Sequence, residues 1–198
     1  MKAKKPTIPP RPNSGSRLSI VRRDLGNGNH EMEIQLGDAP VPERRYTADV
    51  AGILTSRDYA RIIFGQTKIG STELRSMLDI HFPLRAIKRF LVGAVKLEEA
   101  FKAMSQITGA QTEQMIEFSD EPSQTVALSA NSITAALSGS EACMDYIHIS
   151  PSAIERAAKG EDLFAEPVVR VNLSTGLMMA VIEKLKLINI ANIGIESE

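Results

Sequence analysis

The sequence has no tryptophan, a single cysteine and few aromatic side chains, which make up 5% of its 198 residues. One cysteine excludes an internal disulfide framework and is typical of a protein in a reducing compartment. Because Cys143 lies in an apolar run, we interpret it as a packing thiol rather than a reactive one. No apolar run reaches the length of a membrane span, and the basic, proline-containing N-terminus lacks the apolar core of a secretory signal. We therefore expect a cytoplasmic protein without a membrane partner.

The chain also has no large excess of positive or negative charge. The formal net charge is −1, so the whole chain has no general attraction to nucleic acid or to membrane surfaces. Hydrophobic residues make up 43% and charged residues 24% of the chain, as in an ordinary globular protein. The length fits one large domain or two small ones.

Motifs for metal, cofactor or nucleophilic chemistry are absent from the sequence. No HExxH, CxxC or paired Cys/His spacing occurs, so we expect no metal and no cofactor. The serine-rich stretch 129–143 has no GxSxG elbow, and the sequence therefore indicates no catalytic residue. Asp79 and His81 share one face of a predicted strand and form the one candidate acid–base pair. The polar side of a half-buried strand explains them better, and whether the protein is an enzyme stays open.

The stretch from Pro83 to Gly109 predicts a long amphipathic helix, because its apolar residues recur every three or four positions. Pro83 suits a first helical turn and Gly109 a left-handed terminator. Before it, alternation with period two predicts strands over 74–82 and 59–64. A short helix beginning at Ser56 is the alternative for the second segment, but its β-branched and aromatic residues favour a strand. Gly26–Asn29 predicts a hairpin turn between two shorter strands.

The sequence also contains two stretches that repeat the same pattern. Residues from Ala48 match residues from Asn131 at an offset of 83, and residues from Leu78 match residues from Val169 at an offset of 91. The segment 153–167 absorbs the difference as an insertion with a short helix. We therefore predict an α+β protein of two ββ(β)α repeats, with an antiparallel sheet backed by two long helices in a pseudo-dimer. The expected domains are a flexible basic arm (1–16), a first unit (17–118) and a second, diverged unit (124–198).

The second predicted helix begins with six consecutive apolar residues, 177–182. A helix that is apolar on all sides must be covered on more than one side. Its own sheet would cover one side, and the first repeat or a second protomer the other. After it, alternation at Ile188 and Ile190 predicts a final strand. The predicted interaction residues are Leu177, Met178, Met179, Val181 and Ile182.

Basic residues gather in the arm and on the polar face of the first helix. Residues 1–16 cannot bury enough apolar surface to offset the entropy lost on ordering. The functional interpretation is a strip that contacts phosphates or an acidic partner; the preferred one is a solubilising tail and a solvated helix face. The basic residues concerned are Lys4, Lys5, Arg11, Arg17, Arg22, Arg23, Arg85, Lys88 and Arg89.

The order of these elements resembles that of the small bacterial proteins grouped as domain of unknown function 3467. The resemblance lies in a short MEIQL-like strand, a loop with proline and acidic residues, a tyrosine that opens a strand, and an apolar strand that runs into a proline and a closing helix. It implies a fold and a bacterial origin, and no activity. The corresponding residues are Met32–Leu36, Asp38–Glu43, Tyr46, Thr55–Tyr59 and Met77–Phe82 before Pro83.

These features favour a non-catalytic interaction or assembly module of the bacterial cytoplasm, with a phage or mobile-element origin as one option. It would act as a homo-oligomer or with a protein partner. One alternative is a nucleic-acid-associated protein that uses the basic arm and the first helix. Another is a small-molecule binder or enzyme with a site between the repeats, where Asp79, His81 or His148 would line a polar pocket.

Overall fold

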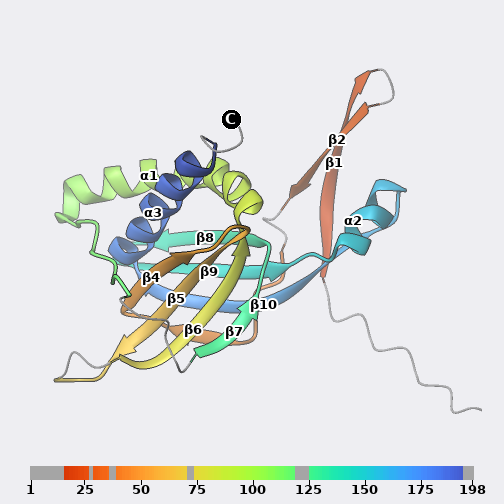
Figure 1. Cartoon of the computed structure of the whole chain (residues 1–198). Helices are drawn as coiled ribbons and strands as arrows, with labels where there is room; N and C mark the ends of the chain where they lie inside the picture. The colour runs from red at the N-terminus through yellow and green to blue at the C-terminus, as the bar shows by residue number, and fades with distance from the viewer. Residues whose placement is uncertain (1–15, 27–28, 36–38, 71–73, 119–124, 194–198) are drawn as a thin grey trace, which may run out of the picture.

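The computed structural model describes residues 16–26, 29–35, 39–70, 74–118 and 125–193 (Figure 1). The chain combines three helices with mainly antiparallel strand pairs in the described residues, which confirms the predicted α+β class. The strands are β1 (Ser16–Gly26), β2 (Asn29–Gln35), β3 (Arg45–Thr47), β4 (Val50–Thr55), β5 (Tyr59–Thr67), β6 (Leu74–Pro83), β7 (Thr125–Ser129), β8 (Ser132–Ser138), β9 (Glu141–His148) and β10 (Leu163–Ser174). The helices are α1 (Leu84–Thr108), α2 (Pro151–Ala158) and α3 (Thr175–Ile193).

The strands form two sheets. One has the order β2-β1-β10-β9-β8, with β3 paired to β10 as well; the other has the order β4-β5-β6-β7. Two pairings in the described residues are parallel, β3 with β10 and β7 with β6. The predicted antiparallel sheet did not include them. β3 lies just before β4 in the chain and β7 just before β8, so each of these strands joins one sheet and leads directly into the other.

Two long helices pack on the sheets, as predicted. α1 contacts β8 and β6, α3 contacts β4, β9 and β10, and the two helices also contact each other (Figure 1). Glu98 of α1 and Lys186 of α3 form an ion pair across this helix–helix contact. α1 follows the extended residue Pro83 and ends at Gly109, whose φ is 71°. The predicted end at Gly109 is confirmed, and glycine suits the left-handed terminator because it has no Cβ to clash. The helix begins one residue later than predicted, since Pro83 is its extended N-cap and not part of its first turn.

Two other local predictions had opposite outcomes. Residues 59–67 form strand β5 and not the alternative helix, because Ile62, Ile63 and Phe64 are fully buried and both faces of the strand are covered. The prediction of a final strand was wrong, since α3 continues to Ile193. Val181 and Leu185 are buried at helical spacing, with Ile188 packed against the same core. Tertiary packing of these side chains favours the helical period over the local alternation.

The main hydrophobic core contains residues from both halves of the chain, among them Phe64, Phe82, Tyr146 and Leu177. A smaller core lies under α2, the short helix predicted within the insertion. Ser150 caps α2 by accepting a hydrogen bond from the Ala153 amide, as a serine N-cap does.

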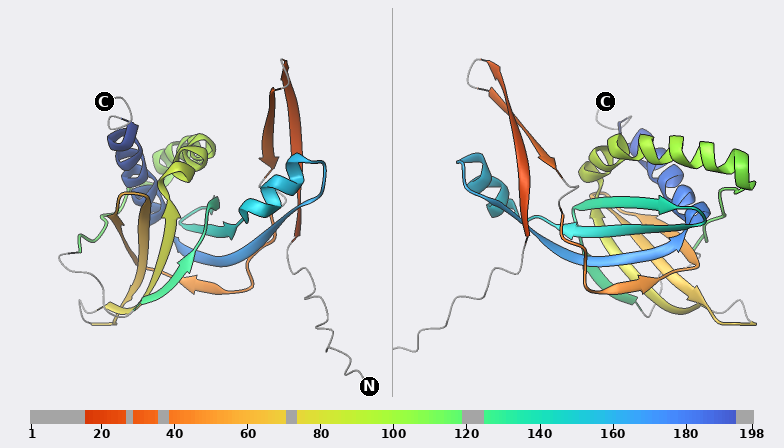
Figure 2. Two further views of the ribbon diagram at one scale, coloured as in Figure 1. Left: turned by 45° about the vertical axis from the view of Figure 1, so that its right-hand side comes forward. Right: turned by 180° about the vertical axis from the view of Figure 1, so that it is seen from behind.

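The hairpin of β1 and β2 stands out from the two-sheet body (Figure 2). β1 pairs with β10 over Ser16–Leu18, and from Ser19 to Gly26 its pairing is with β2. This confirms the predicted hairpin and places it at the periphery of the fold.

Candidate functional site

The predicted pair Asp79 and His81 belongs to a cluster on the face of β6 opposite the main core. The Asp79 side chain is 1% exposed. Arg61 of β5 donates to Asp79 Oδ2 from Nε at 3.0 Å and from Nη2 at 2.5 Å. His81 Nε2 lies 3.5 Å from the same oxygen. The sequence interpretation missed Arg61, which is the principal partner of the carboxylate.

A cavity of about 430 Å³ lies beside this cluster. Tyr59, His81 and Pro83 line one side of it, and β7 residues 127–129 line the other. The rings of Tyr59 and His81 are 6.3 Å apart. Asp79 does not line this cavity, and its charge is neutralised by Arg61. We therefore interpret the cluster as a buried ion pair in the sheet rather than as an acid–base dyad.

A second ion pair joins β9 and β10. Arg170 donates to Asp145 from Nε at 2.6 Å and from Nη2 at 2.7 Å, a bidentate geometry that strengthens the interaction. The hydrogen bond to Asp145 raises the pKa of Arg170, against the opposing effect of burial. The sequence interpretation missed this pair, because only the register of β9 and β10 places Asp145 opposite Arg170. Cys143, which also lies on β9, is partly buried.

The five predicted interaction residues lie inside the chain. Each is at most 3% exposed, and all belong to the main core. The sheets, α1 and the segment after α1 cover the first turns of α3, so residues 177–182 need no second protomer to cover them. A surface for self-association must therefore be sought elsewhere. The residues are Leu177, Met178, Met179, Val181 and Ile182.

The predicted basic residues fall into separate places. Lys4, Lys5 and Arg11 lie outside the described residues. Arg17, at the base of the hairpin, forms an ion pair of 2.8 Å with Asp162. Arg22 and Arg23 belong to β1, and at these two positions the structure describes the backbone alone. The exposed cations of α1 remain as a group, and they comprise Arg85, Lys88, Arg89, Lys96 and Lys102.

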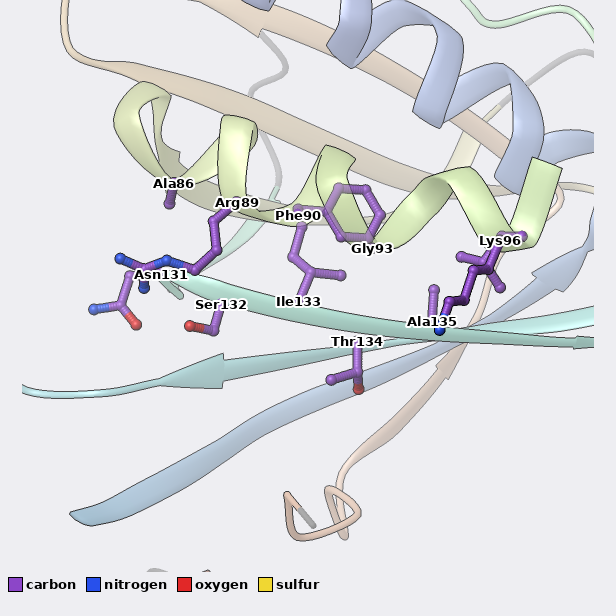
Figure 3. A pocket seen from close by; sticks show the side chains of 11 residues that line it. Ala86, Arg89, Phe90, Gly93, Lys96, Asn131, Ser132, Ile133, Thr134 and Ala135 are labelled. Carbon is purple, nitrogen blue, oxygen red and sulfur yellow. The ribbon is translucent and has the colours of Figure 1, made fainter. Parts of the chain in front are cut away.

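A groove of about 340 Å³ lies between α1 and β8 (Figure 3). Ala86, Phe90 and Leu97 of α1 line it, together with residues 132–135 of β8 and the preceding Asn131. Arg89 extends toward Asn131 and Lys96 toward Ala135, so two cations border an apolar floor (Figure 3). β8 is the edge strand of its sheet, and within the described residues no further strand pairs with it on this side. The sequence interpretation missed this groove; the one signal that points to it is Gly93, an isolated glycine inside the helical pattern.

Within the described part of the chain, no group of three or more His, Cys, Asp and Glu residues lies close enough together to hold a metal ion. None of the described helices has the length and apolar character that would let it cross a membrane. No family model, no curated protein and no solved structure matches this chain. The resemblance to domain of unknown function 3467 therefore stays a prediction.

Proposed function

We propose that this protein is a non-catalytic interaction and assembly module of the bacterial cytoplasm that acts as a homo-oligomer or with a protein partner. The observation that carries the proposal is the projecting hairpin of β1 and β2 (Figure 2). A two-stranded hairpin on its own is at best marginally stable in water. Ile20 and Ile34 pack at its base, while its outer part would gain stability by packing on a second copy or a partner.

Exposed apolar side chains on the helices give the proposal further support. Val92 and Val95 on α1 are 74% and 50% exposed, and Leu187 and Ile190 on α3 are 62% and 66% exposed. Residues three apart on a helix are neighbours on its surface. Each long helix therefore carries an exposed apolar pair, and these pairs replace Leu177–Ile182 as the candidate contacts for association.

The experiment is light scattering coupled to size exclusion on the full chain and on a chain with a shortened hairpin. In the short variant, Asn-Gly replaces residues 22–32 and connects Val21 to Glu33, which already face each other across the hairpin. We expect a defined oligomer for the full chain and a monomer for the short variant. A chain that starts at Arg17 is the matched control and should keep the oligomer. A full chain that stays monomeric at high concentration, or an oligomer that survives the shortening, contradicts the proposal.

We also propose that the two halves are duplicated units related by a pseudo-twofold axis. The strand registers support this. Ala60 faces Phe82 as Ala142 faces Leu173, and Phe64 faces Leu78 as Tyr146 faces Val169. The two parallel pairings correspond in the same way, with Thr47 beside Asn172 and Ser129 beside His81.

These registers shift the earlier strands by 82 residues (142 − 60) and the later strands by 91 (173 − 82). The first offset is one less than the sequence comparison suggested. A slip of one residue turns every side chain of a strand to the other face. With an offset of 83, buried Ala60 would match the partly buried Cys143 on the opposite face, whereas 82 matches it to buried Ala142.

The second candidate is nucleic-acid binding, which the exposed cations Arg85, Lys88 and Arg89 on α1 favour. Binding of this kind weakens steeply with salt. The test is a titration of single- and double-stranded oligonucleotides at low and moderate salt, with the full chain and with a variant that carries Arg85→Glu, Lys88→Glu and Arg89→Glu. Salt-sensitive binding that is lost in this variant supports this candidate, and no binding at low salt removes it.

A further inference from the structure

The segment that follows α1 lies at the edge of the four-stranded sheet. Residues 110–118 form no strand and run past the start of α3 to β4. The Ile116 amide donates to the Ala51 carbonyl at 2.8 Å, and the Glu113 amide donates to the Gly176 carbonyl at 3.2 Å. The Phe118 ring lies so close to Gly52 that a Cβ on this glycine would be 2.3 Å from it. The chain thus supplies its own extended peptide to β4, beside α3.

The groove between α1 and β8 is the counterpart of that place. β4 and β8 are both edge strands, and α1 packs on β8 as α3 packs on β4. With the offset of 82, Ile133 takes the place of Ala51, so its carbonyl is the counterpart of the acceptor for Ile116. In this groove, within the described residues, no segment of the chain is hydrogen-bonded to the outer edge of β8. Gly93 lines this groove, and a Cβ added to it would meet no atom within 4 Å, so there is open space beside the helix at this position.

The two places differ in charge. With the offset of 91, Arg89 and Lys96 of α1 take the places of Ala180 and Leu187 of α3. The segment that lies on β4 already carries two exposed carboxylates, from Glu113 and Glu117. The groove between α1 and β8 offers an edge strand, as β4 does, and adds two cations on its helix. It therefore suits an extended peptide whose acidic groups are directed toward α1.

We propose that the groove between α1 and β8 binds an extended acidic peptide of a partner protein, which adds to the edge of β8 beside Ile133. The inference rests on the proposed role as an interaction module and names its site and the chemistry of its partner. Apolar side chains of the peptide pack on Phe90 and Leu97, and its carboxylates pair with Arg89 and Lys96. The position that faces Thr134 takes a small side chain, because the counterpart residue Gly52 makes room for Phe118 only by lacking a Cβ.

The probe is a fluorescein-labelled peptide with the sequence of residues 111–118 and the change Phe118→Ser, measured by fluorescence anisotropy at low salt. A second peptide that also carries Glu113→Lys and Glu117→Lys tests the charge. We expect the acidic peptide to bind and the lysine peptide to bind at least about tenfold more weakly. In the protein, Arg89→Glu with Lys96→Glu should weaken binding by about the same factor, and Gly93→Phe should abolish it by filling the groove.

Lys88→Glu with Lys102→Glu is the matched control, because these exposed cations of α1 do not line the groove. This control should change affinity by less than about twofold. Hydrogen exchange should show that the peptide protects amides of residues 132–135. Equal losses in the control and in the groove variant overturn the proposal, as does protection elsewhere. The proposal is also overturned if a short oligonucleotide binds at β8 and the peptide does not, because the occupant is then nucleic acid. The same holds if deleting residues 194–198 makes the amides of β8 exchange faster, because the occupant is then this chain itself.

The hairpin-shortened chain separates this inference from the proposed assembly. If the full chain forms an oligomer that depends on the hairpin but no peptide binds, the groove inference fails alone. If the peptide binds to both chains and no oligomer forms, assembly through the hairpin fails alone.

Discussion

The rings of Phe64 and Tyr146 meet edge to face, with their centroids 6.0 Å apart and their planes at 66°. They join β5 to β9 and therefore one sheet to the other, and both side chains are fully buried. Such aromatic pairs contribute about 0.5–1.5 kcal/mol beyond the area that they bury. Within the described residues, the Tyr146 hydroxyl donates only to the sulfur of Met144, at 3.9 Å, and burial raises its pKa well above the ordinary value.

This burial predicts a loss of stability at alkaline pH. The unfolded chain releases the Tyr146 proton above pH about 10, whereas the folded chain keeps it. The contribution of Tyr146 to stability is thus fully present below pH 10 and falls as the pH rises toward the raised pKa of the folded state. Above the tyrosine midpoint the slope from this residue approaches about 1.4 kcal/mol per pH unit. Urea unfolding measures it from pH 8 to pH 11, about two units below the midpoint to about one unit above it.

The control for this prediction is Tyr146→Phe, which keeps the ring contact with Phe64. It should leave stability at neutral pH nearly unchanged, because the hydroxyl has only a weak acceptor, and it should remove the extra alkaline slope. Parallel pH profiles for the two proteins would show that Tyr146 is not the source.

The ion pair of Arg61 and Asp79 gives a second prediction. Arg61→Met leaves a carboxylate that is 1% exposed without its main partner, and breaking a buried pair in this way costs about 3 kcal/mol. Chemical denaturation at neutral pH measures the loss. Replacing both residues, with Arg61→Met and Asp79→Leu, should recover most of it. Arg156→Met is the matched control: it breaks an exposed pair with Glu161 of 4.0 Å and should cost less than about 0.5 kcal/mol. Equal losses for the two single variants would contradict the assignment.

Two glycines of the same helix should respond in opposite directions to replacement by alanine. Gly93 lies inside α1 with open space around its Cα, so Gly93→Ala should stabilise the protein by about 0.5–1 kcal/mol. Gly109 has a φ of 71° at the end of the helix, and Gly109→Ala should destabilise by about 1 kcal/mol. Thermal unfolding of both variants beside the unmodified chain measures the difference. Changes of the same sign would show that these backbone conformations do not control the outcome.

The packing of Phe118 on Gly52 gives the last prediction. Gly52→Ala would place a Cβ 2.3 Å from the ring and 2.7 Å from the Ile116 carbonyl oxygen. Because the backbone must move as well, we expect a loss of about 1–3 kcal/mol and faster hydrogen exchange at the Ile116 amide. Adding Phe118→Ala should recover only part of the stability. Unchanged exchange at Ile116 in Gly52→Ala would mean that residues 110–118 do not depend on this contact.

The local features of this fold were predictable from the sequence because short-range patterns determine them. The end of α1 at Gly109, the strand character of β5, the pairing of β1 with β2 and the short helix of the insertion follow from periodicity and from turn and terminator residues. The candidate chemistry was predictable only in part. The position of Asp79 beside His81 followed from alternation on one strand, but the partner of the carboxylate, Arg61, lies on another strand.

The sequence by itself determined the type of the strongly patterned segments, such as α1 and β5, since backbone geometry and burial periodicity act over a few residues. Tertiary structure alone decided which strands pair. The parallel contacts of β3 with β10 and of β7 with β6 join residues far apart in the chain. It also decided that α3 continues past Ile188 and that residues 110–118 run past the start of α3 to β4. These outcomes depend on the register between distant strands and on what covers an apolar face, and neither quantity is encoded in any single stretch of residues.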